Sequence, residues 1–213
     1  MAPVIPNPDR IRTFEDQAAF ETWLGKHHGS EPEIWIKIHK KASGLPTITY
    51  KEALDVALCW GWIDAISKSF DDLSFLQRFL PRGAKSIWSD INRQNVARLT
   101  AAGKMTPYGQ APVDAAKADG RWDNAYGGSA TLVMPPALLA AITAEPEAYA
   151  TYLTLNSQNR FALSFRVHNL KTEAGKTKRI AAFVAMLKDG KTIYPNGKAN
   201  PAKVAAIPDA STP

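Results

Sequence analysis

The sequence predicts an α+β fold, in which a small three-stranded sheet with packed helices is followed by an α-helical C-terminal module. Residues 33–40 alternate strictly between isoleucine and other side chains, as in a half-buried strand. Residues 62–70 and 75–80 predict two more strands, with Asp71-Asp72 near the turn that joins them. From residue 135 the apolar spacing becomes helical. Hydrophobic residues make up 45% of the 213-residue chain and charged residues 22%, which excludes wholesale disorder.

Capping signals place the helices of the first part of the chain. Thr13 is a good N-cap for a helix over residues 14–27, with Asp16 at its third position. Thr49-Tyr-Lys-Glu52 matches the capping box ahead of an apolar-periodic run, and it predicts a helix over residues 50–59.

The next helix is expected to begin after Ser89 as its N-cap and to end at Gly103. Residues 104–130 are rich in proline and glycine, and they predict a long connection with a short helix near residues 111–118.

The C-terminal third is predicted to be helical to about residue 188. Interruptions are expected at Pro146, at Ser157 as an N-cap and at Gly175, and Gly190 is the expected residue after the last helix. The sequence thus predicts four segments: a flexible lead over 1–12, an α+β domain over 13–130, a helical module over 131–190 and a mobile tail over 191–213.

Charge and cysteine content narrow the classes of function. Cys59 is the only cysteine, so no intramolecular disulfide can form, and a reducing, cytoplasmic location is expected. No apolar run is long enough for a transmembrane segment, and no signal peptide is evident. The net charge is +6, and residues 151–213 hold 10 basic and 3 acidic residues. This asymmetry favours weak contact of residues 151–191 with a polyanion or an anionic membrane surface; a solvated basic helix is the alternative.

Polar and aromatic residues that could form a ligand site concentrate in the middle of the chain. The helix expected after Ser89 presents unpaired N–H groups at its N-terminus, close in sequence to Arg82 and Lys85 and to Arg78 on a strand, so a small anionic ligand could bind there. The alternative is that Ser89 only caps the helix and that the basic residues are solvated. The candidate ligand-binding residues are Trp62, Asp64, Arg78, Arg82, Lys85, Trp88, Ser89 and Asn92.

Two acidic or nucleophilic side chains lie in or near this cluster. Asp64 enters the core on a strand and should pair with an arginine, of which Arg78 is the nearest candidate; a structural pair and a catalytic acid or base are equally compatible with the sequence. Cys59 is expected to be a small buried hydrophobe rather than a nucleophile. The histidines lack metal-ligand spacing and no phosphate-binding glycine loop occurs, so no metal and no cofactor are predicted.

The motifs from Ile48 to Asp64, from Arg78 to Arg82 and from Ser86 to Asn92 occur in order, and a basic stretch runs from Arg160 to Ile180. Together they resemble the bacterial YdeI/OmpD-associated, or bacteriocin-protection, proteins over roughly residues 13–190. Gly175 departs from the continuous Lys/Arg-rich helix that this family usually shows.

The resemblance implies a role in stress or antimicrobial-peptide (bacteriocin) protection, and it implies no particular reaction or catalytic residue. The molecular act stays open between binding of a small anionic ligand, an enzyme acting on a small anionic substrate at the 60–92 cluster, and a basic-helix interaction module. The oligomeric state also stays open.

Overall fold

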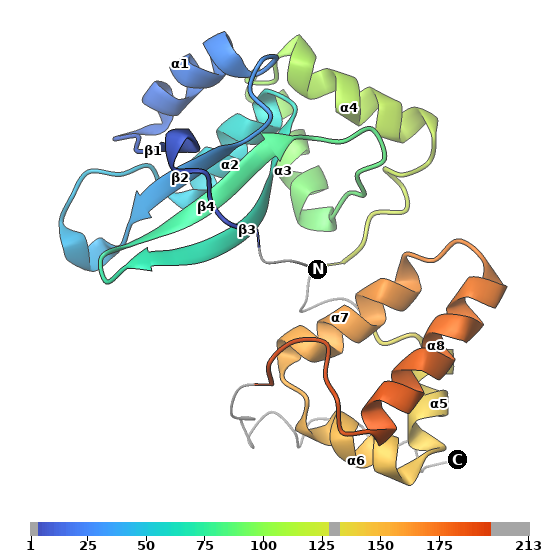
Figure 1. Ribbon diagram of the computed structural model, residues 1–213. Helices are drawn as coiled ribbons and strands as arrows, with labels where there is room; N and C mark the ends of the chain where they lie inside the picture. Colours follow the sequence, from blue (N-terminus) through green and yellow to red (C-terminus); the bar gives the residue numbers. More distant parts are fainter. Residues whose placement is uncertain (1–3, 128–132, 197–213) are drawn as a thin grey trace. The chain divides into compact units, whose positions relative to one another are not determined.

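The computed structural model describes residues 4–127 and 133–196 (Figure 1). The chain divides into two compact units, residues 1–125 and residues 126–213. Within the described ranges, unit 1 holds one sheet and four α-helices, and unit 2 holds four α-helices. The α+β class is therefore confirmed.

The sheet has four strands rather than three. Its strands are β1 (Ile11–Arg12), β2 (Ile34–His39), β3 (Trp62–Asp71) and β4 (Ser74–Pro81), in the order β1-β2-β4-β3. Strand β1 pairs in parallel with residues 35 and 36 of β2, whereas the other pairs are antiparallel. The prediction missed β1 because two residues carry no alternation. Together with the 3₁₀ turn η1 (Pro8–Arg10), β1 orders the end of the segment expected to be a flexible lead.

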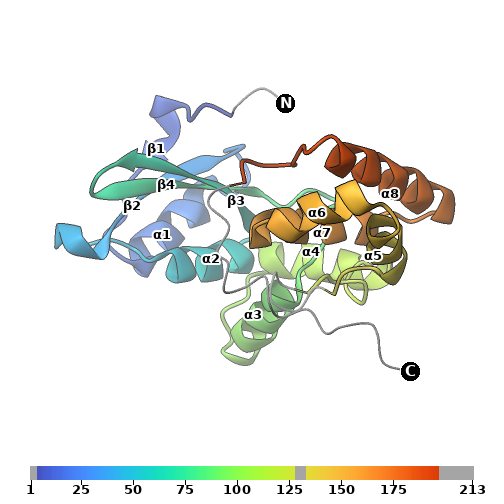
Figure 2. The same cartoon turned by 90° about the horizontal axis from the view of Figure 1, so that it is seen from below.

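Within the described residues, four helices form the core of unit 1 with this sheet. They are α1 (Gln17–His27), α2 (Tyr50–Cys59), α3 (Asp90–Ala101) and α4 (Pro107–Ala118), and the short turn η2 (Lys41–Ser43) follows β2. Figure 2 shows α1 and α2 lying along the same side of the strands, and α3 and α4 pack against α2. The isoleucines of β2 point into the resulting core, as the alternation predicted.

Caps explain where these helices begin. The capping box of α2 is present, with the Thr49 side chain accepting from the Glu52 N–H and the Glu52 carboxylate accepting from the Thr49 N–H. Helix α1 begins at Gln17 and not at residue 14, because Asp16 rather than Thr13 accepts the capping hydrogen bond. Helix α4 likewise begins before the predicted residue 111, because Thr106 caps it.

The end of α2 and the start of α4 are in unusually close contact. The Thr106 hydroxyl donates to the Cys59 carbonyl oxygen over 2.6 Å, and the Thr106 N–H donates to the same oxygen over 3.1 Å. A Cβ at Gly109 would lie 2.2 Å from that oxygen. Glycine at position 109 is therefore required for this junction.

Unit 2 is built from α5 (Pro136–Thr143), α6 (Pro146–Thr154), α7 (Ser157–His168) and α8 (Glu173–Lys188) around its own core, which includes Leu138, Leu163 and Leu187. The interruption expected at Pro146 is the start of α6, and Gly190, expected after the last helix, follows α8 with a positive φ. Asn156, rather than Ser157, is the N-cap of α7.

Gly175 does not interrupt the last helix. It lies in the first turn of α8, where its N–H donates to the capping Thr172 hydroxyl over 3.1 Å. A Cβ there would lie 2.9 Å from that hydroxyl oxygen, so glycine leaves room for the cap. The expected break in the basic helix was wrong.

The first residues of the predicted mobile tail are bound to unit 2. The side chain of buried Asn159 accepts from the Tyr194 N–H over 2.9 Å and donates to the Tyr194 carbonyl oxygen over 3.1 Å. The Asn196 side chain accepts from the Asn156 N–H over 2.9 Å. The rest of that segment, residues 197–213, lies outside the described residues.

Candidate functional site

The predicted site residues have different surroundings: Trp62 lies in the core, Asp64 and Arg78 bind different partners, and Arg82 contacts Trp88. Trp62 is only 1% exposed and its indole N–H donates to the His28 carbonyl oxygen over 3.1 Å, so it belongs to the core. Asp64 accepts a hydrogen bond from the Tyr50 hydroxyl over 2.8 Å. Arg78 donates to Glu33 through its Nε over 2.6 Å. The expected Asp64–Arg78 pair is therefore wrong.

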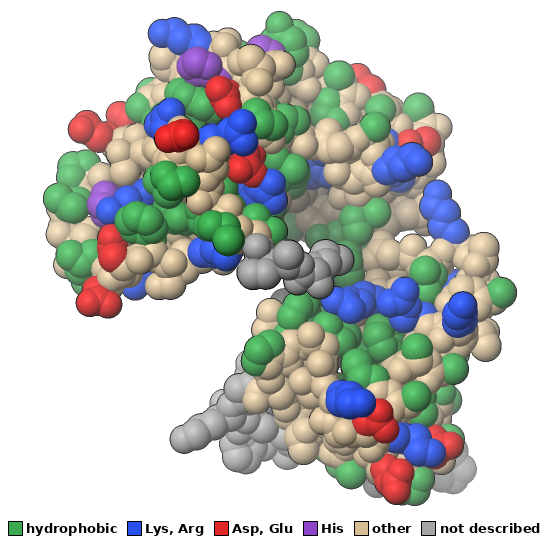
Figure 3. Space-filling view, in the orientation of Figure 1, with side chains coloured by type: hydrophobic (Ala, Val, Ile, Leu, Met, Phe, Trp, Pro, Cys, Tyr) green, Lys and Arg blue, Asp and Glu red, His purple; other side chains and the backbone are tan. Residues whose placement is uncertain are grey.

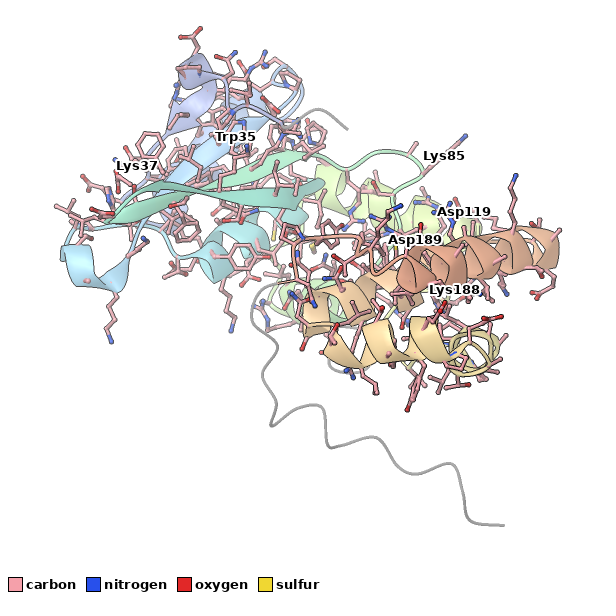
Figure 4. All side chains as sticks on the ribbon, turned by 60° about the horizontal axis from the view of Figure 1, so that its bottom comes forward. Trp35, Lys37, Lys85, Asp119, Lys188 and Asp189 are labelled. Carbon is pink, nitrogen blue, oxygen red and sulfur yellow. The ribbon has the colours of Figure 1, made fainter. Side chains whose placement is uncertain are left out.

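Arg82, Trp88 and Ser89 are brought together at the start of α3. The Arg82 guanidinium lies 3.6 Å from the centroid of the Trp88 ring and donates to the Ile87 carbonyl oxygen over 3.1 Å. Ser89 caps α3 by accepting from the N–H of buried Asn92 over 3.3 Å, as its sequence position predicted. Lys85 extends from the preceding loop (Figure 4).

A second tryptophan completes this cluster. Trp122 lies 4.8 Å from Trp88 in an edge-on arrangement. Arg93 of α3 and Lys117 of α4 place their cationic groups 5.5 Å and 5.4 Å from the centroid of the Trp122 ring. Sequence reasoning missed Trp122 and Lys117 because residues 104–130 show little regular pattern, and no local signal connects them to Trp88.

An open groove of about 370 Å³ lies beside Trp122. It is lined by Asp90, Arg93, Gln94, Ala97 and Trp122. The Asp90 carboxylate lies 3.5 Å from Arg93, so the groove contains an ion pair at the N-terminal end of α3, where the helix dipole is positive.

Arg121 connects the segment before Trp88 with the segment before Trp122 through hydrogen bonds. Its Nε donates to the Asp119 carboxylate over 2.7 Å, and its Nη1 donates to the Ser86 carbonyl oxygen over 2.8 Å. The indole N–H of buried Trp88 has no hydrogen-bond acceptor within residues 4–127 or 133–196. The hydrogen bonds of Arg121 thus hold the cluster together, while the Trp88 indole N–H lacks an acceptor among the described residues.

The environment of Cys59 disfavours the thiolate form. Its thiol is buried at the end of α2, and desolvation by burial raises its pKa to about 11. A thiol with so high a pKa is almost entirely protonated near neutral pH, which fits the expected structural role.

Several basic residues of the C-terminal segment bind partners within unit 2. Arg160 donates to the carbonyl oxygens of Leu153 and Leu155 over 3.1 Å and 3.0 Å. Lys176 pairs with Glu173 over 2.7 Å, and Lys188, labelled in Figure 4, pairs with Glu145 over 2.8 Å. The sequence charge of this segment therefore overstates the charge available to a partner.

Within the described parts of the chain, no group of three or more His, Cys, Asp or Glu side chains could hold a metal ion. In the same ranges, no helix combines the length and the apolar character needed to cross a bilayer.

Comparison with known proteins gives two matches to family models. Residues 12–112 match a model described as Domain of unknown function (DUF8412). Residues 131–190 match the model described as Bacteriocin-protection, YdeI or OmpD-Associated. No curated protein and no solved structure matches the chain significantly. The second match contains the basic stretch from Arg160 to Ile180 and corresponds to the helical unit over α5 to α8. The three motifs between Ile48 and Asn92 lie instead in the residues that match the first model, so the resemblance expected over roughly residues 13–190 is shown for residues 131–190 alone. Residues 131–190 belong to the Bacteriocin-protection, YdeI or OmpD-Associated family, and bacteriocin protection is the role indicated at the level of that family.

Proposed function

We propose that unit 1 contributes to this family-level role by binding a small anionic ligand, with a phosphate or carboxylate group, in the groove beside Trp122. The observation that carries the proposal is the placement of two cations, Arg93 and Lys117, against one tryptophan ring that lines the groove. The N-terminal turn of α3 adds the positive end of a helix dipole at the same place.

The aromatic ring supports anion binding indirectly. A cation held against an indole loses less conformational freedom when a ligand binds, because its position is already restricted. Arg93 can form paired hydrogen bonds with a phosphate or carboxylate. Lys117 adds a point charge from another helix. Arg82 is stacked on Trp88, which in turn packs against Trp122.

Asp90 opposes the ligand. Its carboxylate lies 3.5 Å from Arg93, so a bound anion must share that guanidinium with a like charge. Removal of the Asp90 charge should therefore strengthen anion binding, whereas removal of the Arg93 charge should weaken it. Opposite effects from two neighbouring residues of one helix turn distinguish a specific site from general attraction to a basic protein.

Calorimetric titration with inorganic phosphate, pyrophosphate and citrate tests the proposal. Loss of one charge-assisted hydrogen bond, about 1.5–3 kcal/mol, corresponds to roughly a tenfold or greater loss of affinity in Arg93→Gln. Asp90→Asn should bind more tightly than wild type. Lys51→Gln is the matched control, because Lys51 is exposed on α2 and does not line the groove. Failure of all three anions to bind wild type at roughly 10 mM, or equal affinities in all four proteins, would contradict the proposal.

A second proposal concerns unit 2. Lys171 and Lys178 have no ion pair within the described residues, and Figure 3 shows Lys and Arg side chains gathered along one side of this unit. We propose that they make a weak, salt-sensitive contact with a polyanion or an anionic membrane surface. Binding to random-sequence duplex DNA and to vesicles with phosphatidylserine is expected at low salt; the absence of both would refute this contact.

A further inference from the structure

A second pocket of unit 1 is lined by both positively and negatively charged side chains. It has a volume of about 220 Å³ and lies at the β1 edge of the sheet, between residues 9–12, the second half of α1 and the residues that lead into β2. Figure 3 shows basic, acidic and histidine side chains close together on this part of unit 1.

Most of the charges around the pocket are engaged with one another. Arg10 lies 3.7 Å from Glu31 and 3.9 Å from Glu33, and Glu33 also accepts hydrogen bonds from Arg78. These four side chains form a chain of alternating charge that links the loop before β2 to β4. The two arginines and two glutamates of this network neutralise one another, so the network offers a ligand no net charge.

Two opposite charges are left for a ligand. Among the residues that the structure describes, neither Asp9 nor Arg12 has an ion-pair partner. Within residues 4–127 and 133–196, the guanidinium of Arg12 donates only to the carbonyl oxygen of its neighbour Ile11, over 2.9 Å. Asp9 lies on η1 and Arg12 on β1, and both line the pocket.

The apolar side of the pocket is rigid. The Trp23 ring lies 4.9 Å from the His27 ring and 6.3 Å from Phe20, which is completely buried. Trp23 also meets Trp62 edge-on at 6.1 Å. A ligand side chain can therefore contact an indole that is packed against the core and the imidazole beside it.

We propose that this pocket binds a small zwitterion, a free amino acid or a dipeptide. The ligand carboxylate pairs with Arg12, its ammonium group pairs with Asp9, and its side chain packs against Trp23 and His27. A pocket of about 220 Å³ suits a ligand of this size and is small for a nucleotide or a sugar chain. No residue of this pocket belongs to the Trp88–Trp122 groove, so the inference does not depend on the proposed anion site.

Alanyl-alanine and its two blocked forms test the two contacts separately. Isothermal titration of the full chain compares the free dipeptide with N-acetyl-alanyl-alanine, which lacks the ammonium charge, and with alanyl-alanine amide, which lacks the carboxylate. Each blocked form is expected to bind at least tenfold more weakly than the free dipeptide, because one charge contact is lost.

Variants then assign each contact to its residue. Arg12→Gln should abolish the discrimination against the amide, and Asp9→Asn should abolish the discrimination against the acetylated form. Glu15→Gln, on the same unit but outside the pocket, should behave as wild type. Both pocket residues are exposed, so the variants should fold, which thermal unfolding verifies. Equal affinity for the three peptides, no binding of the free dipeptide at roughly 10 mM, or discrimination that survives in both variants would overturn the proposal.

Discussion

The contact between α2 and α4 makes Gly109→Ala the most informative substitution for stability. The new methyl group would lie 2.2 Å from the Cys59 carbonyl oxygen and 2.7 Å from that of Leu58. Real Cβ atoms essentially never approach another heavy atom more closely than 3.0 Å, so the helices must separate by about 0.8 Å. Both hydrogen bonds from Thr106 to the Cys59 oxygen then lengthen.

The expected loss follows from three contributions. Overpacking at a close contact costs about 1–3 kcal/mol. Two weakened hydrogen bonds add about 2 kcal/mol. The higher helix propensity of alanine returns about 1 kcal/mol, since Gly109 lies within α4. The net destabilisation is thus about 2–4 kcal/mol, equivalent to a fall in Tm of roughly 10 °C for a unit of this size.

Urea and thermal unfolding followed by circular dichroism measure this loss. Gly29→Ala is the matched control, because a Cβ at Gly29 meets no atom within 4 Å and its φ is not positive. That control should stay within about 0.5 kcal/mol of wild type. A Gly109→Ala variant as stable as the Gly29→Ala control would refute the account of the junction and the assigned need for glycine.

Two further predictions concern titratable groups. Cys59 has a pKa of about 11 because of burial, so iodoacetamide should alkylate it much more slowly in the native protein than in urea, and equal rates would contradict its burial. The pKa of Asp71 is lowered from 3.8 to about 2, first by the Ser74 hydroxyl and also by Lys37, so this carboxylate stabilises the fold at higher pH and loses that contribution as the pH falls from about 4 towards 2. Urea unfolding of Asp71→Asn should show lower stability at neutral pH and a weaker dependence on pH in that window; a dependence as steep as that of wild type would count against the assignment.

Local patterns predicted the elements that local forces determine. The capping box at Thr49 and the alternation of β2 fixed α2 and β2 at their observed positions, because each signal involves residues within a few positions of one another. Strand β1 was not predictable in this way, since its two residues are a strand only through their partners in β2. The start of α1 was displaced because both Thr13 and Asp16 are good caps and only tertiary packing selects between them.

The candidate site was predicted only in part, for a related reason. Arg82, Trp88 and Ser89 are near neighbours in sequence, and they do lie together. Trp122 joins them from a segment with little periodicity. Arg78 was assigned to Asp64 by strand proximity, but the fold places Glu33 beside it instead. Asp64 lies opposite Phe79 in the β3–β4 pairing, so the side chain of Arg78, one residue along, is on the other face of the sheet. Proximity along a hairpin therefore did not predict the contact, because the strand register decides which side chains share a face.

Charge alone is therefore a poor guide to binding in this protein. Arg78 and Arg160 count toward the net charge of +6, yet both bind groups of the fold. Arg93 and Arg12 contribute the same formal charge, but each lines a pocket of its own. Among the described residues, Arg93 has one partly exposed counterion and Arg12 bonds only to a backbone carbonyl. A ligand gains most from cations whose partners are absent or weakly held, because displacement of a satisfied, buried partner would cost more than the new contact returns. The two pockets with such cations are for that reason the places where substitutions should alter binding and leave folding intact.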